Sequence, residues 1–169
     1  LLDLNNSIND NWTRYSSYSH SGSYSMRSSY NSSAAANEWL ITPPIVIPSD
    51  AEGMILRWFV RGSSYSNNIA HYTVRVSTTG NTTSDFTDSL FAESYSNSTY
   101  VERTVNLDNY AGETVYIAFI HDSYNDNGLY LDDISVYSTL TPVVSISGPT
   151  LVSEGEDAVF HATMSEGSE

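Results

Sequence analysis

The chain has 169 residues, 40% apolar and 12% aromatic, which is enough to bury one sizeable core. Its formal net charge is −14, which argues against nucleic acid and anionic membranes as partners, because binding to phosphates needs cations that the chain lacks. The sequence contains no cysteine, which excludes disulfides and thiolate chemistry. It also has no apolar run of membrane-spanning length, so we expect no direct membrane insertion.

The first distinctive segment is an aromatic, serine-rich stretch from residue 12 to residue 30. Antibody paratopes use a similar composition, because tyrosine offers a large contact area at a low cost in side-chain entropy. We predict a recognition surface here that stacks on sugars or grips protein. The alternative is that these rings cover the ends of a sandwich. The candidate ligand-binding residues are Trp12, Tyr15, Tyr18, Tyr24 and Tyr30.

Short apolar segments then recur between clusters of Gly, Asn, Ser and Pro, which is typical of an antiparallel sandwich. Apolar and polar residues alternate in 54–60 and 72–77, which predicts strands with one buried face. Both faces of 115–120 are apolar, which predicts a central strand. Prolines flank 45–47 and predict an edge strand, whereas 84–91 has the capping residue and spacing of one short helical turn.

Two adjacent carboxylates, Asp132 and Asp133, interrupt the last strong strand pattern. The apolar parity changes between Leu131 and Ile134, which predicts a β-bulge at the aspartates. We expect at least one carboxylate to lie near the core, where an unpaired charge is costly and needs a cation or several donors. Calcium fits this need, because it takes six to eight oxygen ligands. The alternative is a pair of solvated, turn-like residues.

Four phrases in a fixed order resemble one known family, the cleaved-adhesin or choice-of-anchor J domain of secreted bacterial surface proteins and gingipain-type haemagglutinin regions. The resemblance implies an all-β fold, a jelly-roll-like β-sandwich of two antiparallel sheets over residues 1–138, with the family's first strand missing here. The phrases are NEWLITP at 37–43, HYTVRVSTTG at 71–80, NYAGETVYIAFIH at 109–121 and LDDISV at 131–136.

The same resemblance implies a calcium site built from the aspartate pair and an acidic segment near the amino terminus. The correspondence is direct for the pair and looser for the segment, where asparagines stand at positions that are more often aspartate or glycine in the family. The expected ligands are Asp132, Asp133, Asp3, Asn5, Asn9 and Asp10.

The texture of the sequence changes after residue 138. We expect a linker at 139–142, followed by an incomplete segment at 143–169 that resembles the opening strands of an immunoglobulin-like or PKD-like domain. Two strands cannot bury both of their faces alone, so we expect this part to be flexible, docked on the first domain, or completed by another chain. We therefore expect neighbouring domains of a longer parent chain.

Catalytic signals are weak. No Gly-x-Ser-x-Gly elbow occurs, and the histidines at 20, 71, 121 and 161 lack zinc-ligand spacing. We therefore predict that the chain is not an enzyme. The predicted function is a calcium-stabilised adhesion or ligand-binding module, secreted or on the bacterial cell surface, that binds a host or matrix protein or a glycan. The alternatives are an accessory domain of a secreted protease or glycosidase, or a carbohydrate-binding module that uses Tyr and Trp stacking.

Overall fold

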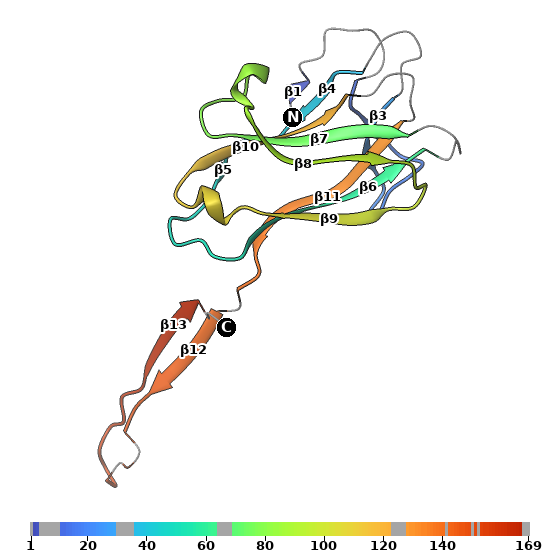
Figure 1. Cartoon of the computed structure of the whole chain (residues 1–169). Coiled ribbons are helices and arrows are strands. Elements are labelled where there is room, and N and C mark those ends of the chain that lie inside the picture. Colours follow the sequence, from blue (N-terminus) through green and yellow to red (C-terminus); the bar gives the residue numbers. More distant parts are fainter. Residues whose placement is uncertain are drawn as a thin grey trace.

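The computed structural model describes residues 2–3, 11–29, 36–63, 69–122, 128–140, 142–149, 151 and 153–166. Two antiparallel sheets face each other to form a β-sandwich, and a separate hairpin follows it (Figure 1). This arrangement confirms the predicted all-β sandwich.

The first sheet is built around strand β10, as the apolar character of both faces of that segment predicts. Its strand order is β1-β4-β10-β7-β8, and β5 pairs with the beginning of β10. The strands are β1 (Leu2–Asp3), β4 (Glu38–Ile41), β5 (Ile45–Val46), β7 (Ala70–Ser77), β8 (Asp88–Tyr95) and β10 (Thr114–His121).

The second sheet carries the site described below. Its strand order is β2-β3-β11-β6-β9. The strands are β2 (Thr13–Tyr15), β3 (Ser25–Ser28), β6 (Met54–Gly62), β9 (Val101–Asn106) and β11 (Leu129–Ser138).

The core lies between the sheets and follows the predicted alternation. Leu56, Trp58 and Val60 of β6 are fully buried, and they face the buried Val74 of β7 and Phe119 of β10. The ring of Phe119 meets that of Trp58 edge-on, with ring centroids 5.5 Å apart. Alternate residues thus supply one continuous apolar layer, whose burial drives the packing of the two sheets.

A second apolar cluster covers the outer face of β10. It comprises Ile41, Ala118 and Ile120, with Phe86 folded over them from the loop that precedes β8. The predicted helical turn is present only as the 3-10 helix η1 (Thr83–Asp85), and Asp88 already belongs to a strand. A second 3-10 helix is η2 (Asp108–Tyr110), and no helix in the described part of the chain is long and apolar enough to span a bilayer.

A chain of polar side chains joins the two sheets through the core. The Trp58 indole N–H donates to the Tyr72 hydroxyl at 3.1 Å, and that hydroxyl donates to Glu93 at 2.6 Å. Glu93 in turn accepts from the Arg103 guanidinium at 3.0 Å. These four residues lie on β6, β7, β8 and β9, so one network ties together strands of both sheets. Burial and the Glu93 contact raise the pKa of Tyr72 well above its usual range.

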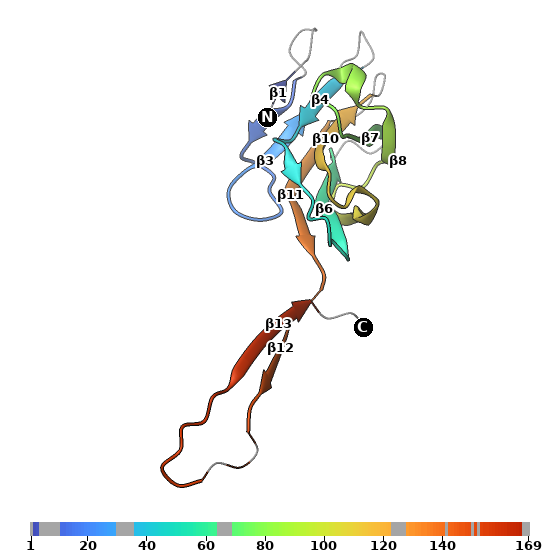
Figure 2. The same ribbon diagram turned by 90° about the vertical axis from the view of Figure 1, so that its left-hand side faces the viewer.

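The C-terminal part is a hairpin of β12 (Pro142–Ser147) and β13 (His161–Glu166), which pair with each other in a sheet of their own. The hairpin extends away from the sandwich in both views (Figures 1 and 2). Ile146, Val159 and Phe160 are 70%, 62% and 63% exposed. Pro142 belongs to a strand rather than to the expected linker, and the immunoglobulin-like assignment stays a prediction.

Candidate functional site

The outer face of the five-stranded sheet carries a cluster of tyrosines and arginines. Strand register places Tyr130 of β11 directly between Arg61 of β6 and Arg27 of β3. Residues opposite each other in an antiparallel pair project from the same face, so these three side chains stand side by side. The loop between β2 and β3, residues 16–24, folds back over this face and adds Tyr18.

Cation–π contacts hold these rings in place. The Arg61 guanidinium lies 3.6 Å from the Tyr18 ring centroid, and that of Arg27 lies 5.0 Å from the Tyr15 ring centroid. Tyr18 also meets Tyr130 edge-on at 5.3 Å and Tyr15 at 5.8 Å. We call Tyr15, Tyr18, Arg27, Arg61 and Tyr130 the tyrosine–arginine face. Tyr130 and Arg61 are buried and support the face from beneath, so a ligand would meet the exposed Tyr18 and the partly buried Tyr15 and Arg27. It collects positive charge in a chain whose formal net charge is −14.

The predicted aromatic residues have different fates. Tyr18 and Tyr24 are 36% and 46% exposed, and Tyr15 is half-buried beside them. Trp12, in contrast, is a core residue that donates its indole N–H to the Glu38 carbonyl oxygen, so it offers no surface for a ligand. Tyr30 lies outside the described residues.

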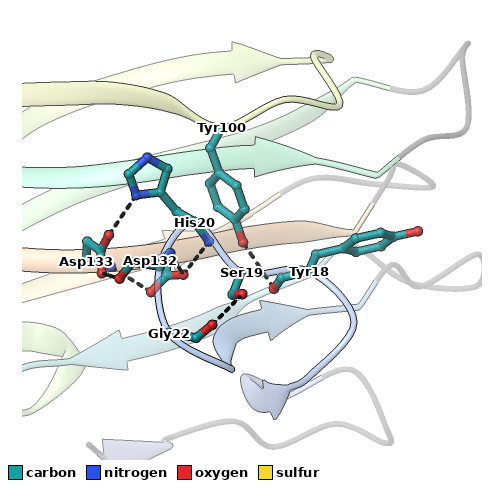
Figure 3. A network of polar contacts seen from close by, with 8 residues as sticks. Tyr18, Ser19, His20, Gly22, Tyr100, Asp132 and Asp133 are labelled. Carbon is teal, nitrogen blue, oxygen red and sulfur yellow. Dashed lines mark hydrogen bonds and ion pairs between the residues drawn. The ribbon is translucent and has the colours of Figure 1, made fainter.

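The predicted bulge is present at the aspartate pair. The register between β11 and β6 shifts between Asp132 and Ser135, and Asp133 adopts a φ of 47°. This left-handed conformation is uncommon for residues other than glycine, but Asp and Asn tolerate it best. Contrary to our expectation, neither carboxylate faces the core. Both are partly exposed on the outer face of the sheet, beneath the β2–β3 loop (Figure 3).

The two carboxylates fasten this loop (Figure 3). Asp132 accepts the backbone N–H of His20 at 2.7 Å and that of Ser21 at 3.4 Å through one oxygen, and the N–H of Asp133 at 2.8 Å through the other. Asp133 accepts the Ser21 hydroxyl at 2.6 Å and the His20 Nδ1–H at 2.7 Å. We call these contacts among His20, Ser21, Asp132 and Asp133 the aspartate clasp.

Aromatic stacking reinforces the clasp. The His20 ring stacks on Phe59 of β6 with centroids 3.6 Å apart. The hydrogen bonds from His20 and Ser21 lower the pKa of Asp133, so its carboxylate stays ionised and accepting at neutral pH. The middle of the loop is therefore fixed to β11 and β6 by charge-assisted hydrogen bonds and by ring contact.

The described residues of the expected calcium site do not by themselves make one. Each of the four carboxylate oxygens of Asp132 and Asp133 already accepts an N–H or O–H group, so both carboxylates have protein partners without a cation. No group of three or more His, Cys, Asp or Glu side chains that would hold a metal occurs in the described part of the chain. The side chain of Asp3 and residues Asn5, Asn9 and Asp10 lie outside the described residues. The calcium site therefore stays a prediction.

His121 and His71 have structural surroundings. The His121 Nδ1 atom lies 2.7 Å from the Ser28 hydroxyl, but both residues are fully buried, so a substrate has no access to them. His71 contacts Asp122, which also accepts the Thr73 hydroxyl at 3.1 Å. The Ser–His contact therefore belongs to the interior of the sandwich rather than to an open cleft.

Sequence reasoning missed several residues of this site. The alternation of apolar and polar residues in β6 and β11 could have predicted that Arg61 and Tyr130 point away from the core. Their adjacency depends on strand register, and the position of His20 over the aspartates joins residues more than a hundred positions apart, so no local pattern reports either.

Comparisons of sequence and of structure with known proteins point to the same family. The model of the Cleaved Adhesin Domain family matches residues 8–136. Hemagglutinin A of Porphyromonas gingivalis is 32% identical over 149 residues, which cover 72% of this chain and 5% of that protein. The chain thus spans about one twentieth of that relative's length.

Two solved structures of cleaved adhesin domains resemble the sandwich. The K3 cleaved adhesin domain of Lys-gingipain from Porphyromonas gingivalis superimposes with a TM-score of 0.58 at 27% identity, covering 69% of this chain and 73% of that one. The K2 cleaved adhesin domain of Lys-gingipain gives a TM-score of 0.61 at 25% identity, covering 76% and 83%.

Proposed function

Because the chain belongs to the cleaved adhesin domain family, we propose that it is a non-catalytic adhesion module of a secreted or cell-surface bacterial protein. The relatives named above are a hemagglutinin and domains of a gingipain, which supports adhesion as the function and a longer parent chain as the setting. The ligand in this proposal is a host or matrix protein or a glycan.

The tyrosine–arginine face is the observation that carries the proposal. Tyrosine and arginine are the side chains that most often anchor binding interfaces, because they combine a large contact area with directed hydrogen bonds. Here cation–π contacts hold them in position before any ligand arrives. A preorganised face of this kind loses little side-chain entropy on binding.

Adhesion is tested by coating a surface with the domain and measuring the retention of red cells and of an array of matrix proteins and glycans. We expect retention by the wild type and a marked loss in the double variant Tyr15→Ala/Arg27→Ala. Tyr137→Ala is the control, because this ring lies at the far end of β11 and is 37% exposed, much like Tyr18. Absence of any retention by the folded wild type would reject the proposal.

An accessory role in a secreted protease is the second candidate, and the kinship with two Lys-gingipain domains supports it. In that case the domain brings a substrate to a catalytic domain elsewhere in the parent. Deleting the domain from the parent would raise the KM for a protein substrate and leave turnover of a short peptide unchanged. Equal effects on both substrates would count against targeting.

We also propose a structural calcium ion, and this part of the proposal rests on the sequence alone. Two adjacent carboxylates and an oxygen-rich amino-terminal segment support it. An ion that binds only the folded state stabilises it, so EDTA is expected to lower the melting temperature. An unchanged melting temperature, with no ion found in the purified protein, would remove calcium from the account.

A further inference from the structure

An open cavity of about 400 Å³ lies beside the tyrosine–arginine face. Three segments far apart in the sequence build it: the β2–β3 loop, the end of β6, and the turn that leads into β9. Its lining residues are Ser17, Tyr18, Ser19, Arg61, Ser98, Thr99 and Tyr100.

The lining combines ring surface with hydroxyl groups. Tyr18 and Tyr100 supply aromatic surface, and Ser17, Ser19, Ser98 and Thr99 supply hydroxyls. The hydroxyls of Ser19 and Thr99 already donate to the Gly22 carbonyl oxygen and to the Asn97 side chain, so they would serve a ligand as acceptors. Burial raises the pKa of Tyr100 above its ordinary value, which already leaves the hydroxyl protonated at neutral pH. A sugar ring presents the same two features, apolar C–H faces and a rim of hydroxyls, so the chemistry of the cavity complements it.

The walls of the cavity are held rigid. The Arg61 guanidinium stacks on Tyr18 and donates through Nε to the Ser98 carbonyl oxygen at 2.5 Å, which joins the loop side of the cavity to the turn side. The Tyr18 carbonyl oxygen accepts the Ser25 hydroxyl at 2.5 Å and the Tyr100 hydroxyl at 3.4 Å. A site formed before binding suits a small polar ligand, whose few contacts cannot offset the ordering of a mobile loop.

The aspartate clasp belongs to the same construction. It grips residues 20 and 21, immediately after the lining residues Tyr18 and Ser19. Ser19 also donates its hydroxyl to the Gly22 carbonyl oxygen at 3.3 Å, which closes the turn at this point (Figure 3). The clasp therefore positions one wall of the cavity without lining it.

We infer that this cavity binds a single pyranose unit at the end of a glycan, with Tyr18 and Tyr100 against the ring and the surrounding hydroxyls on its rim. The inference rests on the proposed adhesion function and names the ligand class of one part of the site. A neutral sugar needs no counter-charge, and the Arg61 guanidinium at this cavity already stacks on Tyr18 and binds the Ser98 carbonyl oxygen.

The test has two steps on the full chain. A glycan array identifies the terminal sugar that the wild type retains, and titration calorimetry with that free monosaccharide measures its affinity. We expect Tyr18→Ala to lose at least tenfold in affinity, which corresponds to about 1.4 kcal/mol or more. Tyr137→Ala is the control and should bind like the wild type.

A gentler variant guards against local unfolding. Ser17→Ala/Ser98→Ala removes two lining hydroxyls and keeps the Ser98 carbonyl oxygen that Arg61 uses. We expect it to weaken sugar binding several-fold at an unchanged melting temperature, whereas Ser94→Ala, an exposed hydroxyl on β8 outside the cavity, should have no effect.

Two outcomes would overturn the inference. One is a wild type that binds no sugar on the array but still retains cells or matrix proteins, in which case adhesion stands and the sugar cavity falls. The other is sugar binding that survives unchanged in both cavity variants, which would place the sugar elsewhere. A wild type that retains no cells, matrix proteins or glycans would instead reject the adhesion proposal itself.

Discussion

Asp132 and Asp133 bind different groups of the β2–β3 loop. Asp132 holds the backbone of the loop through two N–H groups, and Asp133 holds its side chains. Because the loop carries Tyr18 and Ser19, two residues at a bulge in β11 determine where the candidate binding wall stands.

Removing the Asp133 carboxylate should loosen this loop. Asp133→Ala leaves His20 Nδ1–H and the Ser21 hydroxyl without their acceptor, and we expect a loss of about 1 kcal/mol, since a pair this exposed is screened by solvent. Thermal melts measure it, with the exposed Asp50→Ala as the charge-matched control. The loss should persist in EDTA, because the donors belong to the protein. A loss that vanishes in EDTA would show that the carboxylate acts only through the proposed calcium ion and that its hydrogen bonds to the loop add nothing.

The stabilisation from Asp133 should depend on pH. Its pKa is lowered in the folded state, first by the His20 and Ser21 hydrogen bonds and to a lesser degree by the charges of His20 and Arg57. A carboxyl of this kind contributes in full above its unfolded pKa of about 3.9 and loses the contribution as pH falls through the lower folded value. Urea unfolding of the wild type and Asp133→Ala should therefore converge below about pH 4. A stability difference that stays constant from pH 7 to pH 3 would contradict this.

Single residues were predictable where their pattern is local. The parity change at Leu131 and Ile134 predicted the bulge correctly, because a strand has a strict period of two. The side on which the carboxylates emerge was not predictable, because it depends on the loop that folds over them. Trp12 was placed wrongly at the surface, because a tryptophan in a polar segment gives no sign that its indole N–H reaches the Glu38 carbonyl.

At the scale of elements, the network from Trp58 through Tyr72 and Glu93 to Arg103 joins strands of the two sheets. This network contributes to stability, because a buried donor without an acceptor raises the free energy of the folded state. It also gives the hydroxyl of Tyr72 and the carboxylate of Glu93, at the edge of the core, their hydrogen-bond partners.

Tyr72→Phe tests this network. The substitution keeps the ring but leaves the buried Trp58 indole N–H without an acceptor, so we expect a loss of about 1–3 kcal/mol in the free energy of unfolding. Urea denaturation measures it. The matched control is Tyr116→Phe, a partly buried tyrosine of the second apolar cluster, and it should cost much less. Similar losses in the two variants would show that the network adds nothing beyond packing.

The strands themselves were largely predictable. Alternation marks β6 and β7, and an apolar run on both faces marks β10. The prediction for 84–91 was only half right, because its spacing suits a helix, whereas pairing with β7 makes its second half, from Asp88, the beginning of strand β8. Tertiary pairing overrides local preference in such short segments.

At the scale of the whole molecule, the chain combines a closed sandwich with an exposed hairpin. In the described part of the chain the hairpin strands pair only with each other, and Ile146, Val159 and Phe160 of the hairpin are largely exposed. We propose that a neighbouring domain or segment completes this hairpin, because two strands alone are marginally stable in water.

Truncation tests the independence of the sandwich. A chain that ends at Leu140 lacks the hairpin but keeps β11 and its bond from the Thr139 N–H to the Gly53 carbonyl. We expect its melting temperature to equal that of the full chain, because the hairpin adds no strand to either sheet of the sandwich. A clear drop in the melting temperature would show that the hairpin docks on the sandwich and belongs to one folding unit.

The central claim is that ligands meet the outer face of the five-stranded sheet, and nuclear magnetic resonance of the labelled domain tests it most directly. On titration with a ligand that the coated surface retains, we predict the largest amide shifts in residues 15–19, 61, 98–100 and 130. Shifts confined to the opposite sheet, around β7 and β8, would contradict the account.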